Sequence, residues 1–516
     1  MNQQWYQDTY YDEERTYDIA ADYYYYENDA DDDFGALHPW STPVENQYSR
    51  YMFWREFNLI TEQCALPAVL TAYWWSSHVG VTLVASICFR ILILFFQRFR
   101  CLSNWVLHIV CAACGLAPAL ISSSTKENGI PHHRWVPAAL IVGYMVLLYS
   151  ISLLTILLER NNTNKKQEKF NAAVVFSAVV LALLVYREYV LDSSRAWQST
   201  RGTHMLMSMK AVALILDYRS GRLNSLPSIA EYTGYMLCAG CAQLGPYISY
   251  KQYLQAFRSR PSTYLKNLKQ WVAVIKNLGL SMAWFMGSVC YVDWLLDTSY
   301  YRYYGIAIAV DTYRRAASYR SGHYFIAAVG TTNAQACGYL SECDERIVTA
   351  KPSSVEWPKQ MSYVASAWDI PTHQWLKTYV FDKMYSHGKA PIAAAATFAV
   401  SCAIHGFEVR VSAVLAMIGG CAYVELLLRK RLAAKFPIIF GKKSNIKKTS
   451  LSKTTSRWMR IVINMLFVVL NIIHLSYLGA VMDTSNDTES VFSVWHRCAY
   501  IGHLLLFFTY IIAVLL

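Results

Sequence analysis

The sequence predicts an all-α protein that crosses a membrane many times. Of its 516 residues 54% are hydrophobic and only 16% are charged, and the mean hydropathy is positive at +0.20. Soluble proteins of this size carry more charge than this. Apolar runs long enough to cross about 30 Å of hydrocarbon, roughly 20 residues each, recur along most of the chain. These observations together indicate a polytopic helical membrane protein.

The apolar runs predict about ten or eleven transmembrane helices, by length and hydropathy. The predicted spans are 77–97, 102–122, 136–158, 171–189, 231–250, 272–296, 388–406, 411–428, 461–481 and 495–516. Two further apolar pieces, 53–75 and 322–337, are expected to be interfacial or re-entrant helices. The fold class is therefore a bundle of spanning helices supplemented by helices that lie in or dip into the membrane.

The start of the chain has a different composition. Residues 1–35 contain eleven Asp or Glu against one Arg, together with many tyrosines and no long apolar run. Such a composition is typical of a solvated extension that does not pack into a core. We therefore predict an acidic, tyrosine-rich tail over residues 1–50 and a single membrane domain over 51–516.

Several classes of function find no support in the sequence. It contains no glycine-rich phosphate loop, no HExxH pattern and no G-x-S-x-G elbow. The positive charge lies in short loops beside the spans, so no nucleic-acid partner is expected. Most of the thirteen cysteines lie in apolar segments, as do Cys238 and Cys241, which predicts buried small hydrophobes rather than a disulfide framework. We expect no metal and no bound cofactor.

The segment SCAIHGFEVRVSAV, residues 401–414, places His405, Glu408 and Arg410 among apolar residues. Ionisable side chains are costly in hydrocarbon, so in a spanning segment they indicate a functional site by default. Glu408 and Arg410 lie near the break between two predicted spans, where a helix end would satisfy them. His405 is deeper and lies beside Gly406, where neighbouring helices can approach. Both a hydrogen-bonded structural imidazole and a functional histidine remain open on these residues alone.

A second unusual segment is WDIPTHQWLKTYVF, residues 368–381. Asp369 precedes a proline-containing turn and an amphipathic aromatic stretch, a pattern typical of a helix at the membrane interface. One predicted helix separates Asp369 from His405, so the carboxylate and the imidazole can converge inside a bundle. Such a pair could carry out acid–base chemistry in a wet cavity.

These two segments and three others resemble the membrane-bound O-acyltransferase superfamily. The other stretches are RGTHMLMSMKAVALILDYRSG (201–221), LPSIAEYTGYMLCAGCAQLGPYISYKQYL (226–254) and SYRSGHYF (318–325), and the histidine segment continues as AIHGFEVRVSAVLAMIGGCAYVELLLRKRLA (403–433). The resemblance extends over about residues 50 to 510. It is most specific to the branch that attaches a palmitoleoyl chain to a serine of Wnt proteins. That branch more often has Asn at the position of Asp369.

The resemblance implies a fold, a reaction and a location. The fold would surround a central acyl-transfer tunnel in the endoplasmic reticulum membrane. Palmitoleoyl-CoA would be the co-substrate, a Wnt serine the acceptor, and the lipid bilayer the surroundings. His405 would accept the serine proton and return it to the departing CoA thiolate, because a serine hydroxyl needs a general base to become a good nucleophile. Asp369 would orient the reactants.

Further substrate-binding residues are implied more weakly by the matched stretches. Arg201 and Lys210 would contact CoA phosphates or a carboxylate, although cations near span ends also serve as anchors. Gly245 and Pro246 would bend a helix and open a cavity, and the aromatic residues would line the tunnel or pack at the interface. The full set is Arg201, Lys210, Gly245, Pro246, Ser249, Tyr319, Arg320, His323, Trp368, Trp375 and Tyr379.

Two other classes of function stay open. A related membrane acyltransferase that acts on another secreted peptide or on a lipid would keep His405 and Asp369 and differ in its acceptor groove. A polytopic transporter would also bury His, Asp and Arg side chains, along a polar pathway formed by several spans. Acyl transfer that depends on His405 would separate the enzymes from the transporter.

Overall fold

The computed structural model describes most of the membrane domain. The predicted tail, residues 1–50, and several connecting segments lie outside the described residues. The described stretches are 53–99, 103–121, 126–127, 130–131, 135–163, 172–191, 195–258, 264–297, 303–339, 347–385, 390–436, 453–483 and 489–516.

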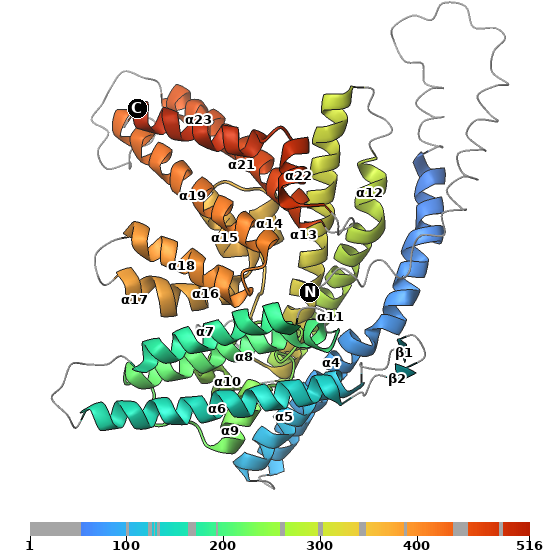
Figure 1. Ribbon diagram of the computed structural model, residues 1–516. Coiled ribbons are helices and arrows are strands. Elements are labelled where there is room, and N and C mark those ends of the chain that lie inside the picture. The colour runs from blue at the N-terminus through green and yellow to red at the C-terminus, as the bar shows by residue number, and fades with distance from the viewer. Residues whose placement is uncertain are drawn as a thin grey trace, which may run out of the picture.

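Helices account for almost all of the described chain (Figure 1). The first half contains η1 (Thr61–Ala65), α4 (Leu66–Phe99), α5 (Asn104–Ile121), α6 (Val136–Thr163), α7 (Ala172–Leu191), α8 (Arg195–Arg219), α9 (Ile229–Met236) and α10 (Tyr250–Arg258). The second half contains α11 (Tyr264–Met286), η2 (Gly287–Tyr291), α12 (Val292–Leu295), α13 (Tyr304–Cys337), α14 (Pro352–Glu356), α15 (Met361–Trp368), α16 (Ile370–Leu376), η4 (Lys377–Phe381), α17 (Asp382–Tyr385), α18 (Ala390–Ile404), α19 (Val409–Lys435), α21 (Lys453–Met482), α22 (Val491–Arg497) and α23 (Ile501–Leu515). Two short strands, β1 (Lys126–Glu127) and β2 (Ile130–Pro131), pair antiparallel.

The structure confirms a polytopic helical membrane protein. Within the described chain, seven helical segments are long and apolar enough to span a membrane: Val79–Phe96, Asn104–Ile121, Val136–Arg160, Ala172–Val190, Leu268–Leu295, Val409–Lys435 and Trp458–Met482. Each coincides with a predicted span. The pair α22 and α23, bent by 75°, adds an eighth if it crosses as one broken span. This number is lower than the predicted ten or eleven.

The prediction of a span over 231–250 was wrong. Helix α9 ends at Met236 and α10 begins at Tyr250, and the segment between them is non-helical although it is buried. Gly240 has a left-handed φ of 71°, which a residue with a side chain rarely adopts. Gly245 lies so close to the Gly240 carbonyl that no Cβ would fit. Gly245 and Pro246 therefore form a tight interior turn and do not bend a helix, because no helix exists there.

The remaining predicted segments differ in their extent. Helix α18, within the predicted span 388–406, has only 15 residues. Residues 322–337 are not a separate re-entrant piece but the second half of the 34-residue α13. Likewise, 53–75 continues without a break into the first span. Helix α13 is only weakly apolar because it carries buried polar side chains. One of them is Gln335, whose Nε2 donates to the Ile347 carbonyl over 2.8 Å.

The long helix α13 forms the centre of the arrangement. It packs against α11, α21 and α4, and Figure 1 shows it in yellow between α11 and α12 on one side and the red helices on the other. Helices α6, α7 and α8 lie side by side in a layer beneath it. The largest hydrophobic cluster joins this layer to the ends of α16 and α18, through Trp375, Leu376 and Ile404. Four of the five matched segments therefore contribute to one core, whereas Tyr324 of the segment 318–325 lies in a separate cluster with Val364 and Ala367.

One disulfide joins two distant segments. Cys64 in η1 and Cys290 in η2 are bonded, with their Cα atoms 6.0 Å apart and a sequence separation of 226 residues. The sequence does not predict this bond, because the two cysteines are far apart along the chain. Cys238 and Cys241 are free and buried, as predicted.

Candidate active site

His405 lies in a tight turn between two helices. Helix α18 ends at Ile404, residues 405–407 form the turn, and Glu408 caps the start of α19. The Glu408 carboxylate accepts hydrogen bonds from the backbone N–H groups of Arg410, at 3.0 Å, and Val411, at 2.7 Å. The expectation that a helix end satisfies Glu408 is thus confirmed, and His405 is at the tip of the turn rather than inside a span.

The backbone of His405 is held by a hydrogen bond from α8. The Arg201 guanidinium donates from Nη2 to the His405 carbonyl oxygen over 2.9 Å. Within the described part of the chain, the half-buried imidazole itself has no hydrogen-bond partner. Burial, assisted by the positive charge of Arg201, lowers the pKa of His405 to about 4. The imidazole is therefore neutral near pH 7 and has a lone pair that can accept a proton.

Asp369 forms the corner between α15 and α16. Its backbone is extended, with φ −138° and ψ 92°. Its carboxylate accepts a hydrogen bond from the Thr372 backbone N–H at 3.2 Å and another from the Thr372 hydroxyl at 2.8 Å. This is the geometry of an N-cap, which satisfies donors that the first turn of a helix leaves unpaired. Asp369 thus fixes the direction in which α16 leaves the corner.

Helix α13 supports the Asp369 corner. The His323 ring stacks on the Trp368 indole, with centroids 3.9 Å apart and planes 6° apart. His323 Nε2 lies 2.9 Å from the Trp368 carbonyl oxygen, and because a carbonyl only accepts, Nε2 carries the hydrogen. Tyr319, one turn earlier, stacks on the same indole at 6.1 Å. Three of the predicted residues therefore pack together beside Asp369.

The same helix connects the corner to the histidine turn. Burial and, to a smaller degree, the nearby Glu408 carboxylate raise the pKa of Tyr319 to about 12. Tyr319 thus lies close to the start of α19 as well as against Trp368. Helices α16 and α18 are also in contact. The helices that follow Asp369 and precede His405 are therefore neighbours, and the convergence of the carboxylate with the imidazole stays a prediction.

Other predicted residues are engaged in bonds that stabilise the fold. Lys210 on α8 is fully buried, and its ammonium lies 2.9 Å from the Tyr235 carbonyl and 3.2 Å from Cys238 Sγ. Arg320 on α13 forms a two-point ion pair with Glu356, with N–O distances of 2.8 Å and 3.0 Å. Neither cation is presented to a ligand in this arrangement. The contact of Lys210 with CoA and the substrate-binding role of Arg320 stay predictions, and the present partners of both are structural.

The predicted aromatic residues after Asp369 are anchored to α8. Trp375 Nε1 donates to the Met209 carbonyl at 3.0 Å, and the Tyr379 hydroxyl donates to Asp217 at 3.0 Å. Ser249 caps α10 through reciprocal hydrogen bonds with Gln252. The hydrogen bonds of Trp375 and Tyr379 fix α16 and η4 against the buried helix α8. A tunnel lined by the aromatic residues stays a prediction.

Sequence reasoning missed one residue of the site. Glu188, near the end of α7, is 9% exposed and forms an ion pair with Arg201 at 3.0 Å. An acid at the end of the apolar run 171–189 was a signal that could have identified it, because buried carboxylates require partners. Elsewhere in the described residues, no group of three His, Cys, Asp or Glu side chains is placed to hold a metal ion.

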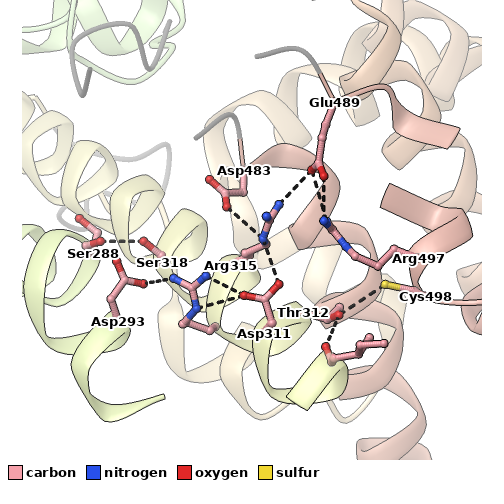
Figure 2. A network of polar contacts seen from close by, with 12 residues as sticks. Ser288, Asp293, Asp311, Thr312, Arg315, Ser318, Asp483, Glu489, Arg497 and Cys498 are labelled. Atoms are coloured by element: carbon pink, nitrogen blue, oxygen red, sulfur yellow. Dashed lines mark hydrogen bonds and ion pairs between the residues drawn. The ribbon is translucent and has the colours of Figure 1, made fainter. Parts of the chain in front are cut away.

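Figure 2 shows a network of charges that joins α13 to residues just before and within α22. Arg315 on α13 pairs with Asp311 at 3.2 Å and with Glu489 at 3.1 Å, and Glu489 also pairs with Arg497 at 2.7 Å. Arg410, in the first turn of α19, donates to the Glu489 carbonyl at 2.8 Å. The turn that carries His405 is therefore tied both to α8 and to the junction of α13 with α22.

Comparisons with known proteins agree with this arrangement. The model of the MBOAT, membrane-bound O-acyltransferase family matches residues 146–472, more than half of the chain. The protein-serine O-palmitoleoyltransferase porcupine of Anopheles gambiae is 26% identical, over 90% of this chain and 96% of its own length. The protein of the same name from Mus musculus is 29% identical, over 74% and 85%.

A relative that matches less of the chain is named for a different acceptor. The lysophospholipid acyltransferase 1 of Arabidopsis thaliana is 24% identical over 42% of this chain and 55% of its own length. The family match contains α8, α13, the Asp369 corner and the His405 turn. This chain is a multi-pass acyltransferase that belongs to the membrane-bound O-acyltransferase family.

Proposed function

We propose that this enzyme transfers a palmitoleoyl chain from palmitoleoyl-CoA to a serine hydroxyl of a Wnt protein, with His405 as the general base. The observation that carries the proposal is the His405 turn: the backbone is held by Arg201 at 2.9 Å, while the neutral ring has no partner among the described residues. The substrate is inferred from the relatives that match most of the chain, which are named protein-serine O-palmitoleoyltransferases.

The reaction needs one proton transfer in each direction. His405 accepts the serine proton while the serine oxygen attacks the thioester carbonyl carbon. The C–S bond of the tetrahedral intermediate then breaks, and the imidazolium returns the proton to the CoA sulfur. An acyl ester and free CoA are the products, and the histidine ends as it began. No metal or resident cofactor takes part in these steps.

Asp369 has a positioning role in this proposal. Its carboxylate is occupied by two hydrogen bonds from Thr372, and an ionised carboxylate cannot donate to an oxyanion. By capping α16, Asp369 fixes the segment that carries Trp375, whose indole is anchored to α8. The carboxylate would thus act on the reaction through the shape of the site.

The endoplasmic reticulum membrane is the location that we infer. Cys64 and Cys290 form a disulfide, and such bonds form and persist in oxidising compartments, including the lumen of the endoplasmic reticulum. The seven apolar helices of the described chain place the protein in a bilayer. An acyl-CoA from the cytosol and a secreted acceptor would then reach His405 from opposite sides.

The test is acyl transfer in membranes that contain the wild type or His405→Ala at equal amounts. The donor is palmitoleoyl-CoA, and the acceptor is a Wnt-derived peptide or the same peptide with its serine replaced by alanine. Acylation of the serine peptide by the wild type alone is the expected result. A lysophospholipid is offered in parallel, because one relative is named for that substrate; transfer to the lipid but not to the peptide would overturn the proposed acceptor.

A further inference from the structure

A single nitrogen atom connects the His405 turn to a buried carboxylate. Arg201 Nη2 is 2.9 Å from the His405 carbonyl oxygen and 3.0 Å from Glu188 Oε1. Arg201 lies on α8, Glu188 on α7, and His405 at the end of α18. One guanidinium therefore ties three helices together at the proposed general base. A planar guanidinium has several donors in fixed directions, which suits it to such a bridge.

The carboxylate side of this bridge is itself fixed. Trp197 is 1% exposed, and its Nε1 donates to Glu188 Oε2 over 3.1 Å. Both oxygens of Glu188 are thus engaged, one by the indole and one by the guanidinium. A carboxylate with this little exposure keeps its charge only when its oxygens are paired. Glu188 accordingly serves as a rigid support for Arg201.

The turn is also fitted to Glu188 by shape. Gly406 has a left-handed φ of 72°. A Cβ placed there would lie 2.8 Å from Glu188 Cγ, which is closer than carbon atoms approach. The residue after His405 must therefore be glycine for the turn to rest on the Glu188 side chain. The hydrogen bond and the close packing hold the same short segment from one side.

We propose that Arg201 and Glu188 are positioning residues for His405: they fix its backbone carbonyl so that the ring points at the reacting serine. This inference rests on the proposed function, because it gives the pair a role only if His405 is the base. It also replaces the expectation that Arg201 contacts CoA phosphates. The positive charge of Arg201 has a second effect, since it favours the neutral form of the imidazole.

The experiment measures kcat, the KM for palmitoleoyl-CoA and the pH dependence of kcat/KM for Arg201→Met and Glu188→Gln. We expect kcat to fall about 10- to 100-fold in Arg201→Met and less in Glu188→Gln, with KM nearly unchanged, because misplacing a catalytic group slows chemistry more than binding. The acidic limb of the profile should move to higher pH in Arg201→Met. The shift of this limb reports the charge of Arg201 beside the ring, whereas a fall in kcat at unchanged KM reports the placement of His405.

The same helix offers a matched control. Arg219, at the opposite end of α8 from Arg201, pairs with Glu159 on α6 at 3.1 Å. Arg219→Met removes an ion pair of the same kind and should leave kcat and the pH profile unchanged. The double variant Arg201→Met with Glu188→Gln should be no slower than Arg201→Met alone. Both substitutions break the same bridge to the His405 carbonyl, so their effects on kcat do not add.

Two results would overturn the inference without touching the proposed function. If His405→Ala is inactive but Arg201→Met keeps the wild-type kcat, the bridge does not position the base. If Arg201→Met raises KM and keeps kcat, Arg201 binds the donor instead. Should Arg201→Met fail to fold, Arg201→Lys decides, because it keeps the charge but lacks the planar set of guanidinium donors. An unchanged kcat in Arg201→Lys contradicts the inference, and a several-fold loss supports it. Activity of His405→Ala would remove the proposed base role itself.

Discussion

His405 and Asp369 each lie in a break between two helices, and in both places a long, polar helix holds a backbone carbonyl of the break. Helix α8 provides Arg201, which donates to the His405 carbonyl at 2.9 Å. Helix α13 provides His323, which donates to the Trp368 carbonyl at 2.9 Å. The two breaks therefore have the same kind of support from residues far away in the sequence.

The two breaks differ in what their own side chains can do. The His405 ring has no hydrogen-bond partner within the described chain, whereas both Asp369 oxygens accept hydrogen bonds from Thr372, at 3.2 Å and 2.8 Å. A ring nitrogen without a partner can accept a proton from a substrate, whereas the hydrogen bonds of the cap already engage both carboxylate oxygens. This difference supports the proposed roles, a base for His405 and positioning for Asp369.

This difference also explains how Asp369 can replace an asparagine. The branch that the sequence resembles more often has Asn there, which differs from Asp in charge but not in its ability to accept the N-cap hydrogen bond. Asn and Asp are about equally good at capping a helix. The exchange is therefore chemically mild if the residue caps α16, and severe if its charge takes part in catalysis.

The largest effect is expected from removing the free group. His405→Ala should lower acyl transfer by at least about 100-fold, the usual contribution of a general base. Its melting temperature in detergent should stay near that of the wild type, because the ring has no hydrogen bond to lose among the described residues. Transfer and melting are measured on the same preparation. A large drop in melting temperature would mean that the imidazole is structural.

The second-largest effect is expected at Asp369, where two substitutions distinguish a role in capping α16 from a need for the negative charge. Asp369→Ala should destabilise the site by about 0.5–2 kcal/mol, as for other lost N-caps, and slow transfer by roughly ten-fold through misplacement of α16. Asp369→Asn should restore most of the rate, because the amide oxygen still accepts from Thr372. Equal losses in Asn and Ala variants would instead show that the negative charge is required.

A smaller effect is expected at His323, which supports the turn between α15 and α16 by its hydrogen bond to the Trp368 carbonyl. His323→Phe keeps a ring on Trp368 but removes the donor to the Trp368 carbonyl, and an unsatisfied buried carbonyl costs about 1–3 kcal/mol. We expect a lower melting temperature and a loss of transfer smaller than in Asp369→Ala. Tyr319→Phe is the control, since it stacks on the same indole and should behave as the wild type. Equal behaviour of the two variants would contradict the role of His323.

The fold class and the catalytic segments could be predicted because their signals are local. Apolar runs identified all seven long spans, and His405 was conspicuous because an ionisable group in an apolar run is costly. The segment 231–250 misled the same reasoning. Its apolar residues are buried by neighbouring protein, not by lipid, and hydropathy does not distinguish these surroundings. The left-handed Gly240, with φ 71°, and the close approach of Gly245 to its carbonyl form a turn in which a helix cannot continue.

The supports of the site could not be predicted, because each joins segments far apart in the chain. Arg201 and His405 are 204 positions apart, and His323 and Trp368 are 45 apart. Arg201 and Lys210 looked alike as cations on one segment, but their surroundings differ. Lys210 is fully buried against backbone carbonyls at the end of α9, whereas Arg201 reaches the histidine turn. Their partners, and not their residue types, determine these roles.

The smallest effect concerns pH, and it tests whether the His405 turn is as dry as its packing suggests. Only the neutral imidazole accepts a proton, so the rate must fall as pH drops through the pKa of His405, which burial and Arg201 lower to about 4. From pH 8 to pH 6 the wild-type kcat/KM should therefore change by less than about two-fold. Each sample is returned to pH 7 afterwards to separate titration from inactivation. A half-maximal rate near pH 6.5, the ordinary pKa of histidine, would show that the ring is solvated like that of an exposed histidine. The contrast between His405 and the Asp369 carboxylate would then rest on their hydrogen bonds alone.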